Sequence, residues 1–134
     1  ENDFFIINGD TYLDFDYAKA LKFHQKNKSL LTVITAHNQF FGFFSSVEIN
    51  KNNQVTTFSK KHFDKKNQNV HAGIYIASPE ILSMIPSKSK YSIEKHLIPQ
   101  LIKKGKIFAY DCKKTFYDIG DSEGYQLACK QLER

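Results

Sequence analysis

Cysteine is scarce in this chain, which has 134 residues but only Cys112 and Cys129. Two cysteines at this spacing form neither a disulfide framework nor the CxxC pairs of a zinc site. No two histidines show the HxxxH spacing of a metal motif either. Free thiols are typical of proteins in a reducing compartment. We therefore expect a cytoplasmic protein.

Long apolar runs and export signals are also missing. No segment approaches the roughly 20 consecutive apolar residues that a membrane-spanning helix needs. The chain starts with the acidic, polar Glu1-Asn2-Asp3, which differs from the basic and then apolar pattern of a signal peptide. Lipidation motifs are absent as well. The sequence therefore predicts no membrane partner.

The glycines exclude several kinds of catalytic loop. The six glycines cannot be arranged into GxGxxG or GxxxxGK, so neither standard phosphate-binding loop occurs within the chain. The GxSxG turn that carries the nucleophile of α/β hydrolases is missing too. Any chemistry that this chain performs must use groups other than these.

Basic residues outnumber acidic residues. There are 19 Lys and Arg against 14 Asp and Glu, which gives a formal net charge of +5. Positive charge favours anionic partners such as phosphorylated metabolites. The lysines form short clusters and no long basic run, so a solvated lysine-rich surface explains the excess better than nucleic-acid binding does. A basic nucleic-acid-binding domain remains an alternative that only the net charge supports.

The chain has enough apolar residues to form a core. Hydrophobic residues make up 41% and aromatic residues 14% of the sequence, and the length suits one domain spanning residues 1–134. Apolar and β-branched runs alternate with stretches of helical periodicity. This alternation predicts an α/β fold with a mixed, Rossmann-like sheet and flanking helices.

The first half of the chain predicts a strand–helix–strand unit followed by a hairpin. The continuous apolar run Phe4–Ile7 is typical of a parallel strand buried on both faces, and Asp16 can cap the helix that follows. With a second strand at Leu30–Ala36, the unit predicts a parallel pair joined by a crossover. The other expected segments are the helix Tyr17–Lys26, the hairpin strands Phe43–Ile49 and Val55–Phe58, and a polar loop at 60–69.

The second half predicts further strands and two longer helices. Ser78, followed directly by a proline, favours the start of a short helix. The longest helix is expected to begin at Ser92 and to end at Gly105, with a kink or break at Pro99. The remaining expected segments are the strands Val70–Ala77, Ile107–Tyr110 and Thr115–Ile119, and a final helix that starts at Asp121.

Two predicted strand ends carry an aspartate beside a glycine. Asn8-Gly9-Asp10 follows the first strand, and Asp118-Ile119-Gly120 ends a later one. Ligands of α/β sheets bind beyond the carboxyl ends of the strands, and two carboxylates meeting there would suit Mg²⁺, which takes substrate phosphates and water as its other ligands. Asn-Gly-Asp is also good turn chemistry. From residue type and spacing alone, the structural interpretation is slightly favoured.

The order of several short motifs resembles the sugar-1-phosphate nucleotidyltransferase family. The motifs are NGDT at 8–11, FGF at 41–43, VEI at 47–49, VTTFSKK at 55–61, VHAGIYI at 70–76, YSIEK at 91–95, and YDIG at 117–120 followed by Tyr125. The ordered set covers nearly the whole chain and is most similar to small bacterial guanylyltransferases that act on mannose or heptose 1-phosphate. The resemblance implies a fold of the nucleotide-diphospho-sugar transferase type. It also implies transfer of a nucleotidyl group from a nucleoside triphosphate to a sugar 1-phosphate.

The resemblance further implies roles for individual residues. Asp10 and Asp118 would bind the catalytic Mg²⁺, and Lys61 would approach a phosphate. Substrate-binding roles fall on Asn8, Gly9, Gly42, His71 and Gly73. Structural alternatives exist for several of them, because strand glycines can simply relieve crowding. Lys61 can be a solvated lysine, and His71 a satisfied core histidine.

The sequence also departs from the family pattern. Lys60 replaces a glutamate that would bind sugar hydroxyls, and His71 replaces an asparagine. The family's N-terminal strand and Gly-rich loop, which grip the nucleoside triphosphate, have no counterpart, so we expect the C-terminal part of the domain. A non-catalytic sugar-phosphate-binding or regulatory module of the same fold is the main alternative. Missing strands would also expose a sheet edge, which a second copy or a partner chain would cover.

Overall fold

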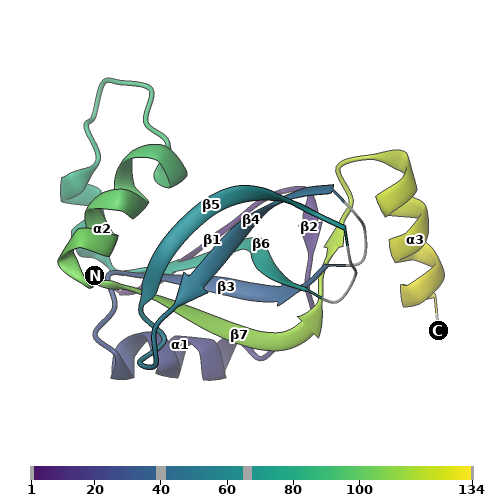
Figure 1. Ribbon diagram of the computed structural model, residues 1–134, viewed down its shortest axis with the longest axis horizontal. Helices are drawn as coiled ribbons and strands as arrows, with labels where there is room; N and C mark the ends of the chain where they lie inside the picture. Colours follow the sequence, from purple (N-terminus) through teal and green to yellow (C-terminus); the bar gives the residue numbers. More distant parts are fainter. Residues whose placement is uncertain (1, 39–41, 65–67, 134) are drawn as a thin grey trace.

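A four-stranded mixed sheet is the centre of the fold (Figure 1). The computed structural model describes residues 2–38, 42–64 and 68–133. The sheet has the strand order β1-β6-β3-β7, while β2 pairs with β8 and β4 pairs with β5. The strands are β1 (Phe4–Ile7), β2 (Thr11–Tyr12), β3 (Leu31–His37), β4 (Gly42–Ile49), β5 (Val55–Phe63), β6 (Asn69–Ala77), β7 (Ile107–Thr115) and β8 (Tyr117–Asp118). The helices are α1 (Tyr17–Lys26), η1 (Pro79–Met84), η2 (Ile93–Leu97), α2 (Ile98–Lys104) and α3 (Ser122–Leu132).

The prediction for Phe4–Ile7 is right about the strand but wrong about its neighbours. β1 runs antiparallel to β6 and lies at one edge of the described sheet. β3 pairs with the other side of β6, so the two strands of the predicted unit run in the same direction without being adjacent. The run is apolar because Phe4 and Ile6 pack against one core cluster and Phe5 against the other. The strand is therefore only partly buried at its edge position.

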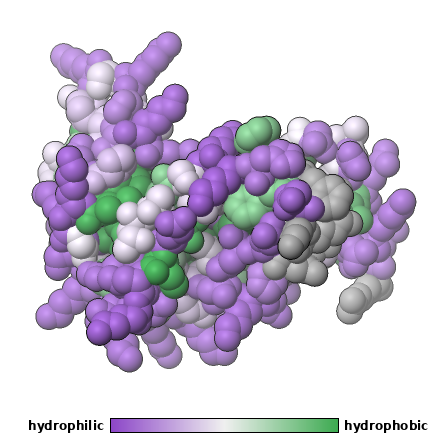
Figure 2. Space-filling view, in the orientation of Figure 1, coloured by the Kyte–Doolittle hydropathy of each residue, from purple (hydrophilic) through white to green (hydrophobic). Residues whose placement is uncertain are grey.

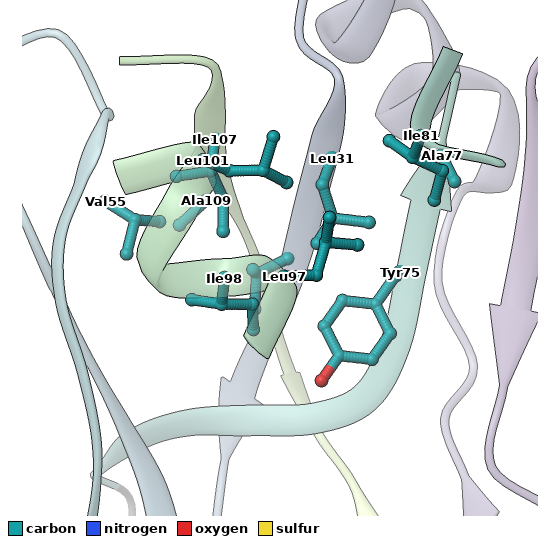
Figure 3. Packing of buried hydrophobic residues seen from close by; sticks show 11 residues of the cluster. Leu31, Val55, Tyr75, Ala77, Ile81, Leu97, Ile98, Leu101, Ile107 and Ala109 are labelled. Atoms are coloured by element: carbon teal, nitrogen blue, oxygen red, sulfur yellow. The ribbon is translucent and has the colours of Figure 1, made fainter. Parts of the chain in front are cut away.

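Two apolar clusters cover the two faces of the sheet. Leu31 and Val33 of β3 belong to one cluster, whereas Ile34 and Ala36 belong to the other, as the alternation of side chains along a strand requires. Helix α2 packs into the first cluster and α1 into the second, which confirms the prediction of flanking helices. Each fully buried Leu or Ile contributes about 1.5–3 kcal/mol. Figure 3 shows the first cluster, in which Leu97, Ile98 and Leu101 lie near Leu31, Val55 and Tyr75.

The predicted hairpin is present and longer than expected. Strand β5 continues to Phe63, so the prediction of a loop at 60–69 is wrong for its first residues. The hairpin turn is fixed by Asn50, whose Oδ1 accepts a hydrogen bond from the backbone N–H of Gln54 at 3.1 Å. Asn53 takes a left-handed conformation (φ 62°), which asparagine tolerates in turns. The hairpin extends across one face of the molecule (Figure 1).

The predicted helix after Ser92 is divided into two kinds of helix. Residues 93–97 form a π-helical turn, in which the Ser92 hydroxyl accepts from the Lys95 N–H. The α-helix begins only at 98, which places Pro99 in its first turn, where a missing backbone N–H costs nothing. The change from π-helical to α-helical geometry falls between Leu97 and Ile98, directly before Pro99, and the predicted left-handed cap at Gly105 (φ 62°) is confirmed.

The last part of the chain differs from the prediction in its strand boundaries. β7 continues beyond Tyr110 as far as Thr115, and β8 contains only two residues, so the predicted strand Thr115–Ile119 is too long. The final helix starts as expected. Asp121 caps it by accepting a hydrogen bond from the Gly124 N–H at 2.8 Å.

Hydrophilic side chains cover most of the face shown in Figure 2, with small apolar areas between them. This pattern agrees with a solvated, lysine-rich surface. Among the described residues, no helix combines the length and the apolar character needed to cross a membrane.

Candidate functional site

The short β2–β8 ribbon brings together the two predicted aspartate-bearing strand ends. Thr11 pairs with Asp118 in an antiparallel register. One step further along, the backbone N–H of Ile119 donates to the carbonyl oxygen of Asp10 at 2.8 Å. Asp10 and Asp118 are therefore neighbours in space although they lie near opposite ends of the sequence.

Gly120 shows how the two carboxylates are oriented. A Cβ placed on this glycine would lie 3.1 Å from Asp118 Oδ1 and 3.3 Å from Asp10 Oδ2. Both carboxylates thus approach the same point, and the separation of these two oxygens cannot exceed the sum of the two distances. A side chain at position 120 would crowd both groups. The glycine leaves open the space between two convergent carboxylates.

The hydrogen bonds of the two aspartates differ. Asp118 Oδ1 accepts from the Gly120 N–H at 2.9 Å, which gives this carboxylate a local structural role. In the described part of the chain, the carboxylate of Asp10 makes no hydrogen bond to the backbone of Thr11 or Tyr12. An aspartate that only stabilised a local turn would accept a hydrogen bond from a backbone N–H one or two residues further on. The geometry therefore leaves the Asp10 carboxylate available for a ligand.

The two carboxylates fit Mg²⁺, but they are too few for a metal site in which protein side chains supply all the ligands. Among the described residues, no group of three or more His, Cys, Asp and Glu side chains could hold a metal ion. Asp10 and Asp118 instead supply two hard oxygen donors, and Mg²⁺ commonly takes one or two carboxylates with substrate phosphates and water. The pair therefore suits an ion that is shared with a bound phosphate compound.

Asn8 and Gly73 form a second close contact beside this pair. The Asn8 N–H donates to the Gly73 carbonyl at 2.9 Å. Gly73 has a φ of +75°, and a Cβ there would lie 2.8 Å from Asn8 Nδ2 and 2.9 Å from Thr11 Oγ1. Both facts require glycine at 73. Gly9 differs, because a Cβ on it would meet nothing within 4 Å.

An open pocket of about 410 Å³ adjoins Asp118. Gly42 and Phe43 from the start of β4 line it together with Asp121 and Glu123 from the beginning of α3. The predicted residues Gly42 and Asp118 thus share one pocket. Phe41 of the same motif lies outside the described residues. The pocket has the size of a small-molecule site.

Gly124 is a structural requirement that the sequence reasoning missed. It lies in the first turn of α3, where a Cβ would overlap the backbone carbonyl oxygen of Asp118. Helix α3 can therefore approach β8 closely only with glycine at this position. A glycine inside a capped first helical turn was the available signal, since glycine disfavours helices elsewhere.

Lys61 contacts Glu48 on the hairpin, and no contact between described residues joins it to the carboxylate pair. Its Nζ lies 3.0 Å from Glu48 Oε1 on the β4–β5 hairpin, and both side chains are about half exposed. The hydrogen bond from Lys61 holds the pKa of Glu48 below its usual value. Lys61 thus has a structural partner in this conformation.

His71 is buried in β6 between aromatic rings. Its ring centroid lies 4.4 Å from that of Tyr75 and 5.6 Å from that of Phe58. Burial lowers the pKa of His71 to about 4, while the backbone of Ile74 acts in the opposite direction. Among the described residues, the buried ring nitrogen Nε2 has no hydrogen-bond partner. The aromatic contacts and the burial of His71 are also those of a core histidine.

Comparison with known proteins connects this geometry to a family. The profile of the family described as "Nucleotidyl transferase" matches residues 1–134. The chain is 25% identical over 126 residues to a mannose-1-phosphate guanyltransferase of Yarrowia lipolytica. The matched region covers 93% of this chain and 34% of the relative. It is 28% identical over 133 residues to a D-glycero-alpha-D-manno-heptose 1-phosphate guanylyltransferase of Aneurinibacillus thermoaerophilus, covering 99% of this chain and 57% of the relative.

Solved structures agree with these relatives. The structure of HddC from Yersinia pseudotuberculosis superimposes with a TM-score of 0.76 and 28% identity, over 96% of this chain and 55% of that protein. A second HddC structure, with a TM-score of 0.74, is a complex with GMP-PN. The chain spans between about a third and somewhat more than half of the length of these proteins. Its mixed sheet with flanking helices has the nucleotide-sugar transferase fold, and the chain belongs to the nucleotidyl transferase family.

Proposed function

We propose that this chain supplies the metal and sugar-phosphate side of a site that transfers a nucleotidyl group from a nucleoside triphosphate to a sugar 1-phosphate. In this reaction a phosphate oxygen of the sugar 1-phosphate forms a bond to the α-phosphorus, and the bond to the departing pyrophosphate breaks. The observation that carries the proposal is the convergence of Asp10 and Asp118 beside Gly120. The names of the two relatives, both of which are sugar-1-phosphate guanylyltransferases, support the reaction class.

The proposed roles follow from what the reaction requires. Phosphoryl chemistry of this kind depends on positioning and on neutralisation of charge more than on a covalent nucleophile. Asp10 and Asp118 would hold Mg²⁺, and a bound Mg²⁺ neutralises phosphate oxygens and fixes their orientation. The two carboxylates are pre-positioned, because the β2–β8 pairing and the Asp118–Gly120 hydrogen bond fix the backbone on which they stand.

The substrate side is proposed at the residues around β6 and the hairpin. Asn8 and Gly73 are in contact, and the side chain of Thr11, the residue that pairs with Asp118, also lies against Gly73. Gly9 leaves open space, and Gly42 opens the pocket that Asp118 lines. Lys61 can take its proposed phosphate-binding role only when its ammonium group leaves Glu48.

A non-catalytic module of the same fold is the second candidate. It is favoured by the Lys61–Glu48 ion pair, which occupies the lysine proposed to approach a phosphate. Lys60, in place of a carboxylate, points in the same direction. Such a module would bind a sugar 1-phosphate and Mg²⁺ without supporting transfer. Binding and turnover therefore have to be measured separately.

The metal side can be tested with Mn²⁺ as a paramagnetic substitute for Mg²⁺. Added Mn²⁺ should broaden the backbone N–H signal of Gly120 in the nuclear magnetic resonance (NMR) spectrum, and excess Mg²⁺ should reverse this. Asp10→Asn and Asp118→Asn should abolish the broadening. Asp111→Asn is the matched control, because the Asp111 carboxylate accepts from the Lys113 N–H at 2.9 Å and lies on β7, outside the β2–β8 ribbon. Equal broadening in all variants would contradict the proposal.

Turnover is tested by pyrophosphate release from GTP and mannose 1-phosphate. Because this chain supplies only one side of the proposed site, we expect binding of the sugar phosphate without release, and release of pyrophosphate would exclude the non-catalytic module. Salt-dependent binding to DNA or RNA, with no response to sugar phosphates, would instead support the nucleic-acid alternative.

A further inference from the structure

The pocket beside Asp118 has walls that carry charge of only one sign. Asp118, Asp121 and Glu123 all line it, and its described lining includes no Lys, Arg or His. The chain as a whole has a net charge of +5, so the charge of this pocket is opposite to that of the whole chain. An anion that is attracted to the chain in general is therefore repelled by the walls of this pocket.

Glu123 is the carboxylate of this pocket that has no partner among the described residues. Asp118 accepts a hydrogen bond from the Gly120 N–H, and Asp121 accepts one from the Gly124 N–H. No described ion pair or hydrogen bond includes the Glu123 side chain. Its backbone is nevertheless held in place, because the neighbouring Gly124 packs directly on the carbonyl oxygen of Asp118.

Phe43 forms an apolar part of the same pocket. It is 67% exposed, the largest exposed fraction among the large hydrophobic residues that the structure describes. The next residue, Phe44, packs in the core against the rings of Phe63 and Phe116. Because side chains alternate along a strand, Phe43 is turned away from the core. Its ring has a described contact only with the ring of His62, so a ligand that covered Phe43 would bury apolar surface.

An exposed aromatic ring and a free carboxylate suit a sugar ring. One face of a pyranose consists largely of C–H groups, and its edge carries hydroxyl groups. Ligand pockets commonly combine aromatic walls with a few polar groups that fix the orientation of the ligand. An ionised carboxylate can only accept hydrogen bonds, so Glu123 fits a hydroxyl or an ammonium substituent. A second anionic group on the sugar would be repelled by Glu123.

We propose that Phe43 and Glu123 determine which sugar 1-phosphates the site accepts. Phe43 packs on the apolar face of the sugar ring, and the Glu123 carboxylate accepts a hydrogen bond from a ring substituent. The site therefore takes neutral sugars and amino sugars, and rejects sugars that carry a second anionic group. This inference rests on the proposed function and adds to it the class of sugar and two residues that select it.

The first test measures how the affinity depends on the charge of the sugar. The ligands are mannose 1-phosphate, mannuronic acid 1-phosphate and 2-amino-2-deoxymannose 1-phosphate, titrated calorimetrically into the chain with Mg²⁺ present. Mannuronic acid 1-phosphate should bind about 10-fold more weakly than mannose 1-phosphate. Glu123→Gln keeps the size of the side chain and removes its charge, so it should reduce this difference to about 2-fold.

Glu80→Gln is the matched control for Glu123→Gln. Glu80 also lies in the first turn of a helix, but it does not line the pocket beside Asp118. It should leave the ratio of the affinities unchanged. A carboxylate in the first turn of a helix also favours the helix dipole. If Glu123→Gln lowers the stability in denaturant unfolding and weakens binding of all three ligands equally, Glu123 acts only through the helix, and the inference is overturned.

The second test removes the aromatic ring. Phe43→Ala should weaken binding of all three ligands about 5- to 10-fold, because each presents the same apolar ring face. Ile49→Ala is the control, since Ile49 is also exposed but lies at the other end of β4. Unchanged affinities in Phe43→Ala would overturn the role of Phe43.

The outcomes separate the inference from the function on which it rests. If the wild-type chain binds mannose 1-phosphate but the ratio of affinities is the same in Glu123→Gln, the inference fails and the proposed function remains. If the wild-type chain binds neither mannose 1-phosphate nor glucose 1-phosphate, the proposed function fails and the inference fails with it. Tighter binding of mannuronic acid 1-phosphate than of mannose 1-phosphate would show that the net positive charge prevails, and would overturn the inference alone.

Discussion

Gly124→Ala is the substitution whose effect follows most directly from the structure. The added Cβ would overlap the carbonyl oxygen of Asp118, which belongs to the backbone and cannot rotate away. Helix α3 and β8 would have to separate, and overpacking of this kind costs about 1–3 kcal/mol. Alanine returns up to about 1 kcal/mol through its higher helix propensity. We expect a net loss of about 1–2 kcal/mol in the free energy of unfolding.

The assay is denaturant unfolding, combined with the Mn²⁺ broadening of the Gly120 signal. Because Asp118 lies directly under α3, the substitution should also weaken Mn²⁺ binding. Gly9→Ala is the matched control for stability, since a Cβ there meets no atom within 4 Å. It should be neutral or slightly stabilising. A Gly124→Ala variant as stable as the wild type, with unchanged Mn²⁺ affinity, would refute the close packing of α3 on β8.

Three further predictions address the site. Asp10→Asn and Asp118→Asn should each have a free energy of unfolding within about 1 kcal/mol of the wild type but should lose Mg²⁺ binding, because a neutral amide replaces an anionic ligand. A variant that is unfolded at room temperature would indicate a structural role instead. Lys61→Ala should cost less than about 1 kcal/mol, because the ion pair with Glu48 is half exposed; a larger loss in thermal unfolding would contradict this. Folding lowers the pKa of His71 from 6.5 to about 4, so the unfolded state binds more protons and stability should fall as the pH drops from about 6.5 towards 4. Unfolding curves of His71→Phe should show a weaker pH dependence, and an unchanged dependence would exclude this residue as its source.

The alternation of segments and the order of the short motifs were enough to predict the fold class. The hairpin, the cap at Asp121 and the cap at Gly105 depend on local residue chemistry, and they are confirmed. The neighbours of β1 depend on which strand lies between β1 and β3, and an apolar run does not contain that information. The sequence could therefore place Phe4–Ile7 in a strand but could not place β6 beside it.

The candidate site was predictable to a similar degree. Asp10 and Asp118 could be paired because each follows an apolar run and adjoins a glycine. The partner of Lys61 could not be predicted, because the ion pair with Glu48 depends on the register and twist of the hairpin. The requirement at Gly124 arises from close packing of a helix on a strand in three dimensions. In the sequence, this close packing is visible only as a glycine at a helical position where glycine is not expected.

The central claim is that Asp10 and Asp118 together bind one divalent ion. Crystals of the chain grown with Mn²⁺ and mannose 1-phosphate, measured at a wavelength where manganese scatters anomalously, test it directly. We predict a single anomalous peak within about 2–2.5 Å of an oxygen of each carboxylate, with a phosphate oxygen as a further ligand. Anomalous peaks only elsewhere, or bound sugar phosphate with no ion between Asp10 and Asp118, would contradict the claim.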